Sequence, residues 1–225
     1  MHRYDRWMLP PRRTSRALLA LYAVVAVLIV IATLFPTSLD RAIGWMAPLL
    51  LAEILVISSD PPRSRLVWLG TAGFALVAAA AAAELIEQIP ALEMGLHAAG
   101  LACWLVALWP LRSGSVLSYR RGWLVLYALV GGIAIFAAAS GSGLTVPVSI
   151  ALIVVAVPTA ILATSLGLTG VFGGAGILLA HTLTVLFISV PAWHLPGIPV
   201  WIAALFLGGS GLLACGFVKQ GLTDG

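Results

Sequence analysis

Charged residues are scarce in this sequence: Asp, Glu, Lys and Arg account for 9% of its 225 residues, whereas hydrophobic residues account for 61%. A soluble domain of this length needs a polar exterior, and so few charges cannot supply one. The mean hydropathy of +1.10 agrees with this interpretation. The shortage of charge therefore argues against a soluble enzyme and predicts a protein that crosses a membrane several times.

Cysteine is nearly absent as well, which limits the chemistry open to the chain. Cys103 and Cys215 both lie inside apolar runs, and this argues against a disulfide framework or a zinc cluster. We interpret them as small buried side chains. The formal charge of +4 comes from basic residues spread over short loops rather than gathered in one patch, so we expect no nucleic-acid partner.

The common catalytic and nucleotide-binding signatures are also missing. The sequence contains no HExxH, GxSxG, P-loop or GxGxxG motif. We therefore expect no cofactor and no metal centre, and motifs alone assign no reaction to the chain.

Long apolar runs are what the sequence has in place of motifs. A helix needs roughly 20 apolar residues to cross the hydrocarbon core of a membrane. Proline, glycine and charge clusters separate eight candidate segments, at 17–35, 42–58, 66–86, 94–110, 122–140, 146–166, 169–190 and 198–218. The separation between 166 and 170 is the weakest, because only SLGLTG divides two apolar runs there.

We predict an all-α fold, a polytopic membrane helix bundle of about eight transmembrane helices. The bundle forms a single domain over residues 17–218. A basic N-terminal segment precedes it at 1–16, and a short tail follows it at 219–225. Small residues, such as the pair Gly170 and Gly174 and the GGSG run at 208–211, favour close contacts between these helices.

The basic residues predict how the helices are oriented. Eleven of the twelve Lys and Arg residues would lie on one side of the membrane, with only Arg41 on the other. By the positive-inside rule that side is the cytoplasm, so both termini are cytoplasmic and the number of crossings is even. We expect a multi-pass protein of a bacterial-type plasma membrane, with membrane lipids as its natural partners.

Ionisable residues inside membrane helices are costly, so each one is a candidate functional residue. Glu53 lies deep in PLLLAEILVI (48–57), where it either carries a proton or remains protonated in a hydrogen bond to a neighbouring helix. Glu84 lies near the end of the third apolar segment. His181 lies in the middle of GAGILLAHTLTVLF (174–187), and is either a catalytic group or a packing residue with one hydrogen bond.

Two other histidines lie close to the ends of predicted helices. His97 is one turn into the fourth segment, and Glu93, four residues earlier, shares its helical face. We interpret Glu93 as part of a solvated loop edge that can pair with His97. His194, in PAWHLPGIP, is most simply a residue of an interfacial loop.

Six apolar blocks follow one another along the chain: RALLALYAVVAVLIVIATLF (16–35), MAPLLLAEIL (46–55), RLVWLGTAGFALVAAAAAAELIE (65–87), MGLHAAGLACWLVALW (94–109), LTVPVSIALIVVAVPTAILA (144–163) and GGAGILLAHTLTVLF (173–187). Their order and spacing resemble the YhhN family, integral membrane proteins that include the lysoplasmalogenases. The resemblance spans nearly the whole chain and rests on apolar patterns rather than on a catalytic string.

The resemblance implies hydrolysis of the vinyl ether bond of a lysoplasmalogen, a lysophospholipid substrate, which gives a fatty aldehyde and a glycerophospho-base. This reaction needs a general acid, a carboxylate that stabilises an oxocarbenium-like cation, and a water. Two aspartates suit these roles in the family, one in a Gly-Asp motif of the third helix and one in a Ser-Asp motif of the seventh.

This sequence departs from that pattern. The Gly-Asp position falls near Ala79 or Ala80, and the Ser-Asp pair falls on Ala180 and His181. Two further polar positions of the family, a lysine and a histidine, fall on Ala47 and near Cys103. Only the His181 position keeps an ionisable group.

Three hypotheses follow from these residues. The first is a lysoplasmalogenase-like hydrolase with His181 and either Glu84 or Glu53 as catalytic residues. The second is a catalytically silent relative that binds a lipid or a partner in the same cavity. The third is a small proton-coupled transporter with Glu53 as the proton carrier, although no clear inverted repeat supports it.

Overall fold

The computed structural model describes residues 13–35, 39–58, 64–86, 89–120 and 122–221. Its ten α-helices are α1 (Arg13–Ala32), α2 (Leu39–Gly44), α3 (Met46–Ser58), α4 (Arg65–Ile86), α5 (Pro90–Leu108), α6 (Val116–Tyr119), α7 (Trp123–Ala139), α8 (Thr145–Ala163), α9 (Leu168–Ser189) and α10 (Ile198–Gly221). Short 3₁₀ turns lie at Trp109–Gly114, Thr164–Leu166 and Pro191–Trp193. The described residues form no strand, and the predicted all-α class is confirmed.

Six helical stretches are long and apolar enough to cross a membrane: Thr14–Ala32, Arg65–Ala83, Pro90–Gly114, Thr145–Leu166, Leu168–Ser189 and Ile198–Gly221. Two shorter apolar stretches, Ala42–Ser58 and Trp123–Ala139, occupy the places of the other two predicted segments. The predicted segments therefore all fall on helices, and six of them have the length of a full crossing.

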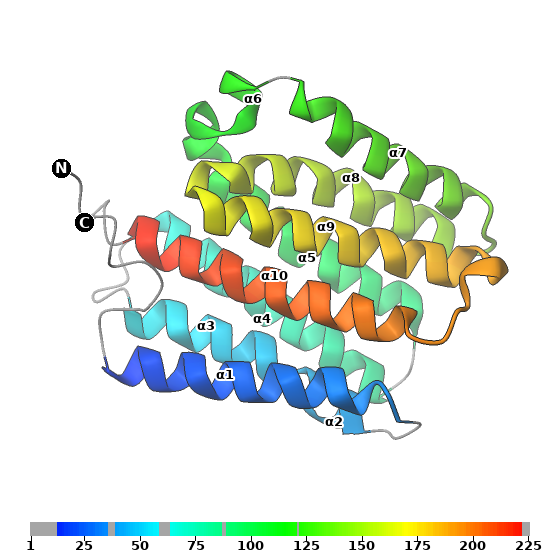
Figure 1. The fold of residues 1–225 in the computed structure, drawn as a ribbon, viewed down its shortest axis with the longest axis horizontal. Coiled ribbons are helices and arrows are strands. Elements are labelled where there is room, and N and C mark those ends of the chain that lie inside the picture. The colour runs from blue at the N-terminus through cyan, green and yellow to red at the C-terminus, as the bar shows by residue number, and fades with distance from the viewer. Residues whose placement is uncertain (1–12, 36–38, 59–63, 87–88, 121, 222–225) are drawn as a thin grey trace.

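The helices run side by side in alternating directions (Figure 1). The first turn of α1 and the last turn of α10 lie at the same end of the bundle, on the left of the view. This is the arrangement that an even number of crossings produces. We call the opposite end, where α1, α4 and α9 finish and α5 and α10 begin, the distal end.

The weakest predicted boundary is a true break in the helix. Gly167 separates the Thr164–Leu166 turn from α9, and its φ of 77° lies in the left-handed region that favours glycine. The backbone reverses there, so that α8 and α9 pack as neighbours. The first glycine of SLGLTG, Gly167, thus marks the end of one helix and the start of the next.

Glycines also bring α9 and α10 close together. A Cβ added at Gly173 would lie 2.8 Å from the backbone nitrogen of Leu213, and one added at Gly209 would lie 2.8 Å from the carbonyl oxygen of Gly173. A side chain at either position would push the two helices apart. The prediction of close contacts at small residues is confirmed for the GGSG run.

Side chains connect the other helices through hydrogen bonds to backbone carbonyls. The Trp104 indole on α5 donates to Gly70 of α4 at 3.1 Å. The Thr159 hydroxyl on α8 lies between two carbonyl acceptors, Val155 of its own helix at 2.7 Å and Leu101 of α5 at 3.2 Å. The Tyr22 hydroxyl on α1 donates to the carbonyl of Leu207 on α10. These bonds satisfy buried donors and hold α1, α4, α5, α8 and α10 around a common interior.

Candidate functional site

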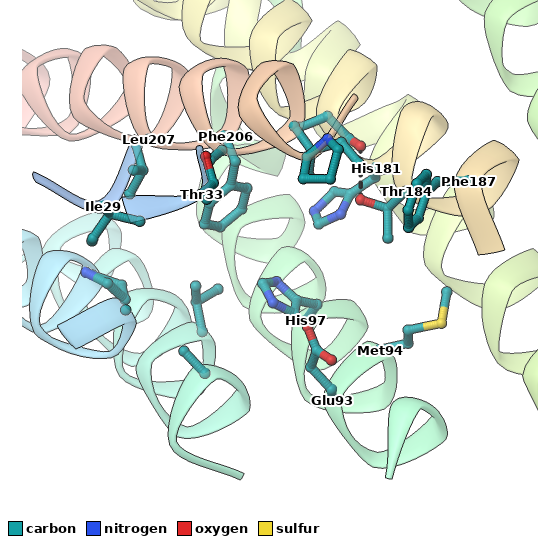
Figure 2. Close-up of a pocket in the computed structure, with 18 of the residues that line it drawn as sticks. Ile29, Thr33, Glu93, Met94, His97, His181, Thr184, Phe187, Phe206 and Leu207 are labelled. Carbon is teal, nitrogen blue, oxygen red and sulfur yellow. Dashed lines mark hydrogen bonds between the residues drawn. The ribbon is translucent and has the colours of Figure 1, made fainter. Parts of the chain in front are cut away.

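A cavity of about 410 Å³ lies toward the distal end of the bundle. Parts of α1, α3, α4, α5, α8, α9 and α10 line it, so it is an interior feature of the whole bundle rather than a groove between two helices (Figure 2). Its wall is mainly apolar. The ionisable side chains that line it, among the described residues, are Glu93, His97 and His181.

His181 reaches this cavity because of the helical repeat of α9. Ala180, His181, Thr184, Phe187 and Ile188 all line it, at the spacing of three and four residues that places side chains on one face of a helix. His181 is only 4% exposed, and its Nε2 atom is buried without a hydrogen-bond partner among the described residues. The polar position in GAGILLAHTLTVLF therefore faces the interior.

His97 meets His181 from the opposite helix, α5. The two imidazole rings contact each other edge to face, with centroids 5.3 Å apart and an angle of 73° between their planes (Figure 2). The Nδ1 atom of His97 is also buried without a hydrogen-bond partner in the described part of the chain. Residues from two helices thus bring two unpartnered ring nitrogens to one place.

Phe206 of α10 completes the contact. Its ring centroid lies 5.3 Å from that of His97 and 5.6 Å from that of His181. An aromatic ring in contact with both imidazoles restricts their orientation and excludes water from that side. The two imidazoles and Phe206 therefore form one aromatic cluster in the wall of the cavity.

Glu93 supplies the negative charge at the site. It lies one turn before His97 on α5 and lines the same cavity (Figure 2). The hydroxyl of Thr184, by contrast, donates to the carbonyl of Ala180 at 3.0 Å within α9, so its proton is already used. Glu93 is therefore the carboxyl side chain that lines the cavity together with the histidine pair, among the described residues.

The structure places Glu53 away from His181, two residues that the sequence grouped together. Glu53 is exposed on α3 and does not line the cavity. Glu84 belongs to α4, but its side chain lies outside the described part of the structure. Of the three predicted site residues, His181 is the one that the structure places in the cavity.

The described α4 residues that line the cavity are apolar. Val77 and Ala81 of α4 line it, one helical turn apart, while Ala80 is fully buried and faces elsewhere. The resemblance places a family aspartate close to these positions. The carboxylate at the cavity thus comes from α5, through Glu93, and not from a described residue of α4.

His97 and Glu93 were recognised in the sequence as a pair, but not as part of the site. The signal that could have found them is the four-residue spacing that places both on one face of a membrane helix. Among the described residues, no group of three or more His, Cys, Asp and Glu side chains has the geometry to hold a metal ion.

The length and apolar character of the helices are those of a multi-pass membrane protein. No protein-family model, no curated protein and no solved structure matches the chain.

Proposed function

We propose that the chain is a YhhN-like integral membrane hydrolase that cleaves the vinyl ether bond of lysoplasmalogen-type lipids in the cavity of His97 and His181. In this proposal eight helices cross the membrane, and both termini are in the cytoplasm of a bacterial-type cell. The observation that carries it is the meeting of two unpartnered imidazole nitrogens in a mainly apolar cavity. Buried polar atoms without partners cost free energy, so their presence favours a site in which a bound molecule supplies the partner.

The reaction adds one water to the vinyl ether. A proton from a general acid binds the outer alkenyl carbon, and the electron pair of the double bond forms the new C–H bond. The inner carbon becomes an oxocarbenium ion, which water attacks while a general base takes the proton from that water. The hemiacetal then splits: the protonated base gives its proton to the glyceryl oxygen as the C–O bond breaks, and the deprotonated acid takes the proton of the hemiacetal hydroxyl. The products are a fatty aldehyde and the free hydroxyl of the glycerophospho-base, and both catalytic groups return to their starting states.

His97 and His181 have the two roles that this sequence needs. Two imidazolium ions with ring centroids 5.3 Å apart would repel one another, so the pair acts as one acid and one base. We assign the acid to His97, because Glu93 lies one turn away on the same helix and lines the same cavity. His181 then accepts the proton of the attacking water.

In this proposal Glu93 has the role that the sequence analysis assigned to Glu53 or Glu84. Its negative charge stabilises the oxocarbenium ion, and the apolar wall strengthens that interaction by excluding solvent. The exposed position of Glu53 gives no support to the alternative in which it carries a proton through a transporter.

A second candidate function is binding of the same lipid without turnover. The apolar α4 wall at Val77 and Ala81 favours it, because the resembled family has an acid in that region. Both candidates place the lipid in the same cavity, and they differ in whether the histidine pair performs chemistry.

Aldehyde release from a lysoplasmalogen by the purified, reconstituted protein tests the proposal. Replacing one member of an acid–base pair lowers turnover by about 10²–10⁴-fold, so His97→Ala and His181→Ala are each expected to reduce the rate by that factor. Because the two residues act as a unit, the double variant should be no more than a few-fold slower than the less active of the two single variants.

The outcomes separate the two candidates. Equal aldehyde release by the wild type and the double variant would reject the hydrolase. Lipid binding by the wild type with no aldehyde would leave the binding protein as the function. Independent, multiplicative effects of the two substitutions would reject the pair as the catalytic unit.

A further inference from the structure

A second cavity of about 450 Å³ adjoins the histidine cavity at the distal end of the bundle. Thr33, Phe187 and Pro199 line both cavities, so the two share a wall. The second cavity lies where the end of α1 faces the loop between α9 and α10. A group bound in the second cavity therefore lies next to the wall of the first.

His194 is the ionisable side chain that lines the second cavity, among the described residues. It is exposed in the loop between α9 and α10, and its imidazole contacts the ring of Phe187 with centroids 5.0 Å apart. Phe187 thus stands between the two cavities and touches His194 at the boundary. The Thr33 hydroxyl donates to the carbonyl of Val30 at 2.7 Å, and the rest of the lining is mainly Pro, Gly, Leu and Val. His194 therefore supplies the side-chain hydrogen-bond donor of this cavity, among the described residues.

The ends of the helices place this loop at the edge of the membrane. The exposed side chain of Trp193 is next to His194, and Trp201 is exposed in the first turn of α10. Exposed tryptophans at helix ends are typical of the membrane–water interface, where lipid headgroups lie. The second cavity thus has a polar group at interfacial depth, whereas the histidine pair lies deeper.

We propose that the second cavity binds the phosphate-bearing headgroup of a single-chain lipid, with His194 donating a hydrogen bond to a phosphate oxygen. The inference rests on the proposed function, in which the bond to be cleaved lies at His97 and His181. It assigns a direction to the lipid: the headgroup is at the α9–α10 loop, and the reactive bond is on the side of Phe187 that faces His181.

The distances along α9 agree with this direction. Six residues separate His181 from Phe187, which corresponds to roughly 9 Å of helix rise. That is the scale of a glycerophosphate unit and its contacts at each end. A lipid whose phosphate is at His194, beside Phe187, would therefore extend along α9 in the direction of the histidine pair.

Comparison of two lipids with the same chain tests the headgroup assignment. Binding of lysophosphatidylcholine and of a monoacylglycerol to the reconstituted protein is measured for the wild type, His194→Ala and His194→Asn. Neither lipid contains a vinyl ether, so binding is separated from the proposed turnover. Trp193→Phe serves as the matched control, because it changes the same loop and lines neither cavity.

A hydrogen bond to a charged group leads us to expect about a 10-fold loss of lysophosphatidylcholine affinity in His194→Ala, with monoacylglycerol affinity unchanged. His194→Asn retains an N–H donor and should recover part of the loss. Equal losses for both lipids would show a packing role and overturn the proposal, as would unchanged affinity for lysophosphatidylcholine. Inorganic phosphate that competes as strongly as the lipid would show a free-phosphate site and would also overturn it.

Failure of this inference is distinguishable from failure of the proposed function. If aldehyde release requires His181 but the preference for lysophosphatidylcholine over monoacylglycerol does not depend on His194, the headgroup assignment alone is wrong. If the preference depends on His194 but no aldehyde is released, the hydrolase alone is wrong. If neither lipid binds, both are rejected.

Discussion

Replacing His181 with leucine is expected to stabilise the protein while abolishing its activity. The imidazole is 4% exposed, its Nε2 atom has no hydrogen-bond partner among the described residues, and its neighbours include the ring of Phe206. A buried polar atom left without a partner costs about 1–3 kcal/mol. Leucine has a similar volume and no polar atom, so it removes this cost without leaving a large void.

The free energy of unfolding is expected to rise by about 1 kcal/mol. This is the lower end of the cost of an unpartnered buried polar atom, because leucine does not reproduce the shape of the imidazole ring. For a chain of this size it corresponds to about a 2–4 °C rise in Tm. Thermal unfolding in detergent without added lipid measures it, and aldehyde release is measured on the same samples. His97→Leu should behave in the same way.

A loss of stability greater than about 1 kcal/mol in His181→Leu would refute this reasoning. Such a loss would mean that the imidazole makes a structural hydrogen bond in the folded protein. The ring would then be a packing residue, and the argument from unpartnered nitrogens would no longer support a functional site.

Three further predictions concern the rest of the bundle. Gly209→Val should lower Tm strongly, because its Cβ would lie 2.8 Å from the carbonyl oxygen of Gly173, whereas Gly208→Val has open space and should have little effect on Tm. Tyr22→Phe should cost about 0.6–1 kcal/mol of unfolding free energy in a denaturant titration, since it removes one hydrogen bond between α1 and α10; an unchanged midpoint would show that the bond contributes nothing. Glu53→Gln should leave aldehyde release within two-fold of the wild type, because the side chain is exposed and lines neither cavity; a large loss would restore Glu53 as a site residue.

The helices could be predicted from the sequence because their causes are local. Apolar runs of suitable length, interrupted by proline, glycine and charge, correspond to helices in the structure, and even the weak break at SLGLTG coincides with a positive φ at Gly167. His181 could be selected for the same reason, since a polar residue within an apolar run is visible without knowledge of the fold.

The partners of His181 could not be predicted, because they depend on how distant helices pack. The contact of His181 with His97 and Phe206 joins three helices separated by long stretches of sequence. The close approach at Gly173 and Gly209 sets the distance between α9 and α10. No local sequence pattern predicts which faces of the two helices then contact each other. Spacing alone therefore identified Glu84 and Glu53 as plausible partners, whereas the packing brings Glu93 to the cavity.

The most direct test of the account is an experimental structure with a bound, non-hydrolysable ether lysolipid. The account predicts the lipid between α5, α9 and α10, with its ether oxygen or the adjacent carbon within hydrogen-bonding reach of His97 Nδ1 or His181 Nε2. A lipid bound only on the outer surface of the bundle, with the two nitrogens still unpartnered, would contradict it.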